Sequence, residues 1–179
     1  VTEEIAESKG IKIDREAFDK EMKAHQEASR AGAEQKFKGG LANTSEQTTR
    51  LHTAHHLLLK ALQEVVSPAI HQKGSNITEE RLRIDFNFDR KLTDEEKKSV
   101  EDKVNDWIKQ NLKVIKREMP RTEAEKLGAE MEFGVKYPDV VSVYFIEDAN
   151  GNTISKEFCG GPHVEHIGNL GTFKIQKEE

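Results

Sequence analysis

The sequence is poor in cysteine, tryptophan and proline, with one, one and four of these residues in 179. A single cysteine, Cys159, excludes an internal disulfide and favours a reducing compartment, so we expect a cytoplasmic protein. No apolar run approaches the length of a membrane span, and the first residues do not follow a signal-peptide pattern. Glycine loops of the Walker or dinucleotide-binding type are also missing, so we expect no ATP bound to this segment. These absences indicate a protein without a membrane partner.

Charged side chains are abundant and nearly balanced. Lys and Arg number 28 against 33 Asp and Glu, which gives a net charge of −5. This charge argues against indiscriminate nucleic-acid binding, and we expect no DNA partner. A local basic face toward RNA is still possible, and an ordinary solvated surface explains the same residues equally well. The candidate basic residues are Lys109, Lys113, Lys116, Arg117 and Arg121.

The first 43 residues differ from the rest in their pattern. They predict a short helix and a longer one whose apolar stripe, with Phe18 and Met22, is too narrow to bury much. Gly39 and Gly40 then mark a connector. We therefore expect a helical segment over 1–43 that leads into a domain over 44–179. Since neither end resembles a natural terminus, we expect an excised piece of a longer protein.

A central helix carries the strongest helical pattern. Thr44 and Gln47 form a capping-box pattern, and Pro68 disfavours continuation beyond Val66. His52 and His56 stand four residues apart, so they share one side of this helix at the rim of its apolar arc. The apolar arc consists of Leu51, Ala54, Leu58, Leu59, Leu62, Val65 and Val66, with His55 inside it. The opposite side carries Arg50, Thr53, Lys60 and Glu64.

Strand patterns follow the helix and predict an α+β fold, with an antiparallel or mixed sheet packed on the central helix. A second helix begins at a capping box formed by Thr93 and Glu96. Residues 71–76 are rich in turn formers and predict a turn. Strands are expected over 82–88, 113–119, 140–146, 153–158 and 172–175, and a short helix over 122–127.

A second histidine motif, Cys159-Gly160-Gly161-Pro162-His163, lies far from the first in sequence. Three imidazoles and one thiolate suit a tetrahedral zinc ion, so we expect one ion at His52, His56, Cys159 and His163. Either motif alone is weak, because isolated histidines at this spacing are often surface or core residues. Position 53 is threonine where a zinc protease of the H-E-x-x-H type has its glutamate, which argues against that class.

Four motifs together resemble the editing domain of bacterial alanyl-tRNA synthetases. They are Leu51-His52-Thr53-Ala54-His55-His56-Leu57-Leu58, Gln72-Lys73-Gly74-Ser75, Arg81-Leu82-Arg83-Ile84-Asp85-Phe86 and Cys159-Gly160-Gly161-Pro162-His163-Val164. The similarity extends upstream through Phe18 to Leu41. Pro162 is closer to the related threonyl-tRNA synthetase domain, whereas Gly160 and the Gln-Lys-Gly-Ser turn favour the alanyl family.

The resemblance implies an aminoacyl-tRNA deacylase that hydrolyses mischarged seryl-tRNA(Ala), and glycyl-tRNA(Ala) second. It implies a catalytic and metal-binding role for His52, His56, Cys159 and His163. Substrate contacts are implied at Gln72, His55, Gly160 and Gly161, with the two glycines near the terminal adenosine. The implied partners are the acceptor end of tRNA(Ala) and the other domains of the same synthetase. ATP would bind only in the separate aminoacylation domain.

The sequence departs from that family at two places. His55 stands where the family usually has a threonine that helps to select serine, and the β-barrel that usually precedes the H-x-x-x-H helix is missing. Two alternatives stay open: a non-catalytic, zinc-stabilised tRNA-binding module, and a threonyl-type or free-standing trans-editing domain. Four protein ligands favour a structural zinc site, because catalytic zinc keeps an open position.

Overall fold

The computed structural model describes residues 20, 22, 23, 40–132, 134–148 and 150–179. Most of the helical segment predicted over 1–43 lies outside these residues. The chain divides into two compact units, Val1–Phe37 and Lys38–Glu179. The second unit contains every element described below, and the predicted boundary after residue 43 stays a prediction.

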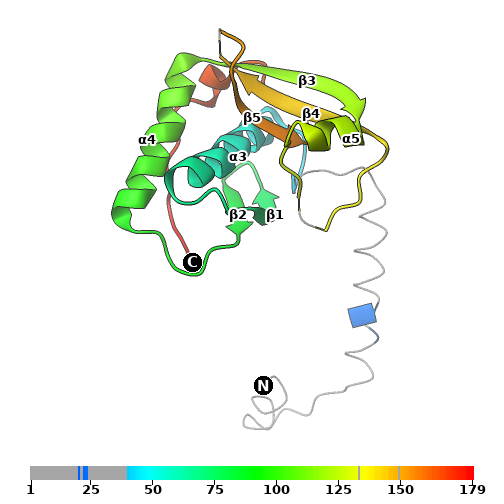
Figure 1. Ribbon diagram of the computed structural model, residues 1–179. Helices are drawn as coiled ribbons and strands as arrows, with labels where there is room; N and C mark the ends of the chain where they lie inside the picture. The colour runs from blue at the N-terminus through cyan, green and yellow to red at the C-terminus, as the bar shows by residue number, and fades with distance from the viewer. Residues whose placement is uncertain (1–19, 21, 24–39, 133, 149) are drawn as a thin grey trace. The chain divides into compact units, whose positions relative to one another are not determined.

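Helix α3 (Glu46–Val65) forms the centre of this unit (Figure 1). Its N-cap is Ser45, whose side chain accepts a hydrogen bond from the Thr48 N–H. The capping box predicted at Thr44 and Gln47 is therefore wrong by one residue. The physical reason is that Asn43 Oδ1 accepts from Ser45 N–H at 3.0 Å, which places the serine at the cap. Leu58 and Leu62 are buried as predicted.

Helix α4 (Asp94–Gln110) packs beside α3 and begins at the predicted capping box. The Thr93 side chain accepts from the Glu96 N–H, and the Glu96 carboxylate accepts from the Thr93 N–H. Val100, Val104, Trp107 and Ile108 are its buried residues. Among the described residues, none of the helices is both long and apolar enough to span a bilayer.

A three-stranded antiparallel sheet leads into the loop that carries Cys159 and His163. Its order is β3 (Lys113–Pro120), β4 (Val140–Glu147) and β5 (Thr153–Phe158). The nearly continuous apolar run of β4 occupies the central position, as expected for a strand with neighbours on both sides. The short helix α5 (Arg121–Lys126) follows β3. Because β5 ends at Phe158, Cys159 emerges directly at the end of a strand.

A separate two-stranded antiparallel sheet pairs β1 (Gln72–Ile77) with β2 (Leu82–Phe86). The prediction of a turn over 71–76 is wrong. Turn formers such as Gly74 lie inside β1 because pairing with β2 supplies the backbone hydrogen bonds, with an irregularity in register between Gln72 and Gly74. The chain reverses later, where Thr78 N–H donates to the Arg81 carbonyl oxygen at 2.9 Å. Tertiary pairing thus overrides local propensity here.

The end of the chain is extended but does not form the strand predicted over 172–175. The 3₁₀ turn η1 (Ile167–Leu170) comes before this segment. The backbone of the segment forms hydrogen bonds to side chains of α4, and not to another strand. Asn105 accepts from the Phe173 N–H and donates to its carbonyl oxygen, both at 2.9 Å. The Glu101 carboxylate accepts from the Ile175 N–H at 2.8 Å. The α+β class is confirmed, with antiparallel pairing in both sheets.

Candidate metal centre

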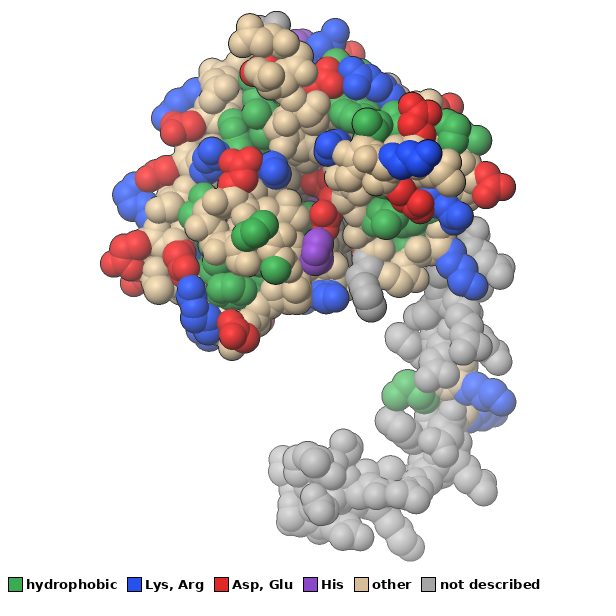
Figure 2. All heavy atoms as spheres, viewed as in Figure 1, with side chains coloured by type: hydrophobic (Ala, Val, Ile, Leu, Met, Phe, Trp, Pro, Cys, Tyr) green, Lys and Arg blue, Asp and Glu red, His purple; other side chains and the backbone are tan. Residues whose placement is uncertain are grey.

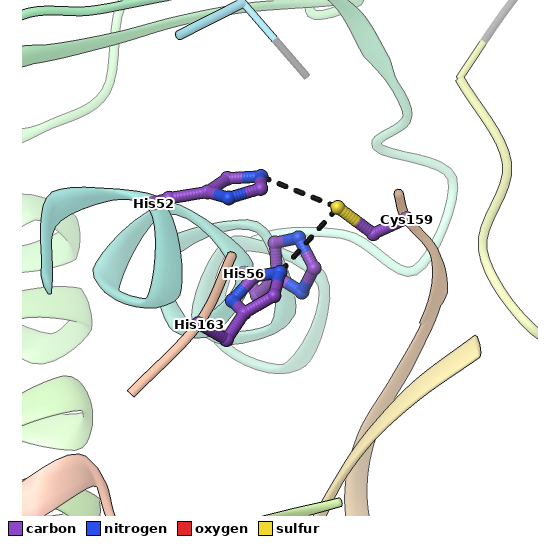
Figure 3. A group of neighbouring side chains, drawn as sticks. All are labelled: His52, His56, Cys159 and His163. Carbon is purple, nitrogen blue, oxygen red and sulfur yellow. Dashed lines mark hydrogen bonds between the residues drawn. The ribbon is translucent and has the colours of Figure 1, made fainter. Parts of the chain in front are cut away.

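The four predicted ligands converge although two come from α3 and two from beyond β5 (Figure 3). One ligand atom from each of His52, His56, Cys159 and His163 lies within 4.8 Å of all the others. The His163 ring centroid is 4.2 Å from that of His52 and 4.4 Å from that of His56. Three imidazoles and a sulfur therefore surround a common point at the rim of the helix.

His52 presents an unprotonated nitrogen to this point. Its Nδ1 lies 3.0 Å from the Pro162 carbonyl oxygen. Because a carbonyl oxygen only accepts, Nδ1 carries the proton and Nε2 has a free lone pair. That Nε2 lies 3.3 Å from Cys159 Sγ. The hydrogen bond to Pro162 thus fixes the tautomer that a metal ligand requires.

Thr53 fixes the tautomer of His163 in the same way as Pro162 fixes that of His52. The sequence pattern had placed Thr53 on the side of α3 opposite the apolar arc. It is fully buried, and its Oγ1 donates to the Thr49 carbonyl oxygen at 3.2 Å. The same oxygen accepts from the Val164 N–H at 3.2 Å and lies 3.0 Å from His163 Nδ1. With its proton committed to Thr49, the hydroxyl accepts from Nδ1–H of His163. His163 Nε2 is then free and lies 3.4 Å from Cys159 Sγ.

The position of Thr53 could have been found from helical spacing, since it precedes His56 by three residues and so shares its side of the helix. Glu157 was also missed, and its signal was strand alternation, because it stands two residues before Cys159 in the chain. Its Oε2 is 3.5 Å from His56 Nε2, and its Oε1 accepts from Ser155 Oγ at 3.2 Å. Burial raises the pKa of Glu157 to about 8 and lowers that of His56 well below its usual value. Each shift favours the uncharged form of its group.

The electrostatics of the cluster suit a cation. Burial lowers the pKa of His52 to about 4 and that of His163 well below its usual value, so both are neutral ligands at physiological pH. Burial raises the pKa of the Cys159 thiol to about 12, opposed by a hydrogen bond from the Gly161 backbone. A bound cation would favour the thiolate. Three nitrogens and one sulfur form a donor set of borderline softness, which zinc prefers.

Gly161 allows the loop to approach His52 closely. A Cβ at this position would lie 2.6 Å from His52 Cε1, a distance that real Cβ atoms essentially never show. Gly160, the other glycine for which the resemblance implies a substrate contact, lies in the same loop and is exposed. The loop therefore requires a glycine at 161 for steric reasons, and the histidine beside it is held in place.

The other two predicted substrate residues lie on different elements. Gln72 is buried at the start of β1 and donates a hydrogen bond to the Glu132 carboxylate. His55 is buried on α3, with its ring centroid 6.2 Å from that of His56. Neither ring nitrogen of His55 has a hydrogen-bond partner among the described residues, and burial lowers its pKa to about 3. An imidazole buried in this way lacks the partners that such groups ordinarily have.

The candidate basic face is largely neutralised by nearby acids. Lysine and arginine side chains mix with acidic ones over the surface seen in Figure 2. Ion pairs join Lys109 to Asp106, Lys116 to Glu118, Arg117 to Glu147 and Arg121 to Glu125. These residues therefore form a mixed surface, which matches the solvated-surface interpretation better than a strongly basic one.

The chain is similar to segments of known aminoacyl-tRNA synthetases. Residues 141–179 match the family described as threonyl and alanyl tRNA synthetase second additional domain. Over all 179 residues, the chain is 55% identical to an alanine–tRNA ligase of Treponema denticola and 52% identical to one of Borreliella burgdorferi. In each case it covers 29% of the relative. An alanine–tRNA ligase of Fusobacterium nucleatum is 45% identical over 131 residues, 73% of this chain and 14% of that protein.

Proposed function

We propose that this chain, a homologue of one segment of the alanine–tRNA ligases, is an editing module that hydrolyses the ester bond of mischarged seryl-tRNA(Ala). Glycyl-tRNA(Ala) is the second substrate that we propose. A synthetic site that accepts alanine rejects serine weakly, because serine adds only a hydroxyl group, so a separate hydrolytic site is needed. The observation that carries this proposal is the convergence of His52, His56, Cys159 and His163 within 4.8 Å.

The reaction does not require a strong general acid or base, because an aminoacyl ester is already reactive. The site must position a water molecule beside the ester carbonyl and stabilise the oxyanion that develops. Burial keeps the imidazoles of His52 and His163 neutral, so the Nε2 lone pair of each can either ligate a metal ion or accept a hydrogen bond from water. A zinc ion held by His52, His56, Cys159 and His163 would supply Lewis-acid polarisation. Thr53 and Pro162 keep two of these rings oriented for the reaction.

Substrate contacts are proposed at the four remaining residues. Gln72 offers a buried amide, hydrogen-bonded to Glu132, for the hydroxyl or amino group of the amino acid. Within the described residues, both ring nitrogens of His55 lack a hydrogen-bond partner, so they could bond to a ligand or to water. Gly160 and Gly161 shape the loop for the terminal adenosine. On this account residues 44–179 form the editing domain and 1–43 lead in from an upstream region.

The partners follow from the substrate and are proposals as well. They are the acceptor end of tRNA(Ala), with its terminal adenosine, and the other domains of a full-length synthetase. The chain spans 29% of the length of the alanine–tRNA ligases that it matches most fully. ATP would bind in another part of such a protein.

A non-catalytic role is the second candidate, and one observation favours it. Four protein donors can fill a tetrahedral zinc site, as in zinc sites that only stabilise a fold. Here the ion would join α3 to the loop after β5, and the domain would serve as a tRNA-binding scaffold. This candidate predicts that metal removal lowers stability and that mischarged tRNA is not hydrolysed.

The deciding experiment measures hydrolysis of seryl-tRNA(Ala), glycyl-tRNA(Ala) and alanyl-tRNA(Ala) by the chain. The editing proposal predicts rapid loss of the seryl ester and slow loss of the alanyl ester, whereas rates equal to spontaneous hydrolysis for all three support the scaffold. Seryl-tRNA(Thr) as a fourth substrate tests a threonyl-type specificity. His55→Thr should change the ratio of seryl to alanyl hydrolysis if His55 contacts the substrate, and an unchanged ratio assigns it to packing.

A further inference from the structure

The loop after α5 carries a carboxylate toward the Cys159 end of β5. Glu130 forms a parallel bridge with this strand: its N–H donates to the Lys156 carbonyl oxygen and its own carbonyl oxygen accepts from the Phe158 N–H, both at 2.9 Å. Because the pairing is parallel, the chain beyond Glu130 continues in the direction of Cys159. Glu132 follows two residues later.

Contacts on both sides hold this part of the loop in place. His71, the residue before β1, lies with its Nδ1 2.7 Å from Glu130 Oε1. The Tyr137 ring packs against Phe158 with centroids 5.0 Å apart. The Glu132 N–H donates to the Tyr137 hydroxyl oxygen at 3.1 Å. Glu132 is thus positioned by the backbone and by two anchored neighbours.

Within the described part of the chain, the Glu132 side chain has a polar partner in Gln72. It is half-buried and accepts a hydrogen bond from the Gln72 amide. Among the residues that the structure describes, no lysine, arginine or histidine forms an ion pair with it. Burial raises the pKa of Glu132. Glu157, on the strand that ends beside Cys159, is buried and contacts Ser155 and His56, so the half-buried Glu132 is the more accessible of the two carboxyl groups.

We infer that Glu132 binds the α-ammonium group of the aminoacyl ester and orients Gln72 toward it. This inference rests on the proposed function. Every aminoacyl ester carries an α-amino group, and an ammonium group has three donors to distribute. One donor meets the Glu132 carboxylate. The Gln72 NH₂ donates to Glu132, and its carbonyl oxygen is an acceptor for a second. The pair thus recognises an amino acid as a class, and the choice among amino acids lies elsewhere in the site.

The test pairs a protein variant with a change in the substrate. The full chain and its Glu132→Gln variant are each given seryl-tRNA(Ala) and the analogue in which a hydroxyl replaces the α-ammonium group. The control variant is Glu123→Gln, which removes the same charge from an exposed position on α5. Deacylation rates below saturation give kcat/KM for each combination, and thermal unfolding checks that both variants fold.

The unchanged protein should hydrolyse the hydroxyl analogue about tenfold or more slowly than the seryl ester, as expected for loss of a close charge pair. Glu132→Gln should lower the seryl rate by a similar factor and leave the analogue rate unchanged, while Glu123→Gln should alter neither. Equal kcat/KM values of the unchanged protein for the two esters would overturn the inference. An equal decrease of kcat/KM for both esters in Glu132→Gln would overturn it as well. If the unchanged protein hydrolyses neither ester, the proposed function itself has failed, which is a distinct result.

Discussion

Replacing Thr53 by valine should weaken the metal centre without touching any of its four ligands. The threonine hydroxyl accepts from His163 Nδ1–H and from the Val164 N–H. Valine has nearly the same shape but no oxygen, so both donors lose their acceptor. His163 is then free to shift its proton between nitrogens, and the tautomer with a bare Nε2 is no longer fixed.

The expected magnitude follows from these two contacts. A buried donor left without a partner costs about 1–3 kcal/mol, so two partly buried donors should lower the free energy of unfolding by roughly 2–4 kcal/mol. Loss of a hydrogen bond that orients a metal-binding histidine should weaken metal affinity by about 10–100-fold. Thr49→Val is the control, because it makes the same change one helical turn earlier and leaves the Thr49 carbonyl oxygen in place.

Two assays measure these effects separately. Urea unfolding of the metal-free chain gives the stability change, and competition with a chelator of known zinc affinity gives the binding change. A Thr53→Val variant that binds zinc as tightly as the unchanged chain and unfolds at the same urea concentration would refute the assignment of Thr53 to the centre. The same would follow if Thr49→Val caused an equal loss.

Three further predictions concern the core, the loop and acid. Leu62→Ala should lower the free energy of unfolding by about 2–5 kcal/mol, because Leu62 is fully buried between α3 and its neighbours; urea unfolding with no measurable change would contradict this packing. Gly161→Ala should abolish tight zinc binding in the chelator assay, since its Cβ would lie 2.6 Å from His52 Cε1; retained affinity would mean that the loop moves without cost. The metal-free chain should lose stability as the pH falls below about 6.5, because the folded-state pKa values of His52 and His55, about 4 and about 3, lie below the ordinary value. Between the unfolded-state pKa of about 6.5 and the lower folded-state pKa, the unfolded chain binds more protons than the folded chain. Each histidine should therefore lower the free energy of unfolding by up to about 1.4 kcal/mol per pH unit. Urea midpoints that stay constant from about pH 7 to about pH 5 would contradict the burial of neutral histidines.

Periodic patterns allowed most of the fold to be predicted from sequence. The capping box at Thr93 and Glu96 and the strands over 140–146 and 153–158 each depend on near neighbours in the chain, and each was confirmed. The predictions for residues 71–76 and 172–175 were wrong because the backbone partners of both segments lie outside the segment, where local propensity does not show them. The first segment becomes a strand through pairing with β2, and the second bonds to side chains of α4.

The convergence of His52, His56, Cys159 and His163 was predictable from sequence, but their surroundings were not. Two spaced motifs identified the four donors, because metal chemistry restricts residue type and spacing. Thr53 was assigned to the side opposite the apolar arc; its spacing from His56 indicates the side of the helix that it shares, but the loop that covers it is a tertiary contact. Glu132 was not found for a related reason: the bridge of Glu130 to β5 and the contact with Gln72, which position it, are both tertiary.

The most direct test of a hydrolytic centre is the single-turnover rate of seryl-tRNA(Ala) deacylation by Cys159→Ala compared with the unchanged chain. Cys159 is buried, and its sulfur lies within 3.4 Å of the ring nitrogens of His52 and His163. The account predicts that the variant hydrolyses the ester no faster than it decays in buffer, while circular dichroism shows the same fold. Hydrolysis by a folded Cys159→Ala variant at the unchanged rate would contradict it.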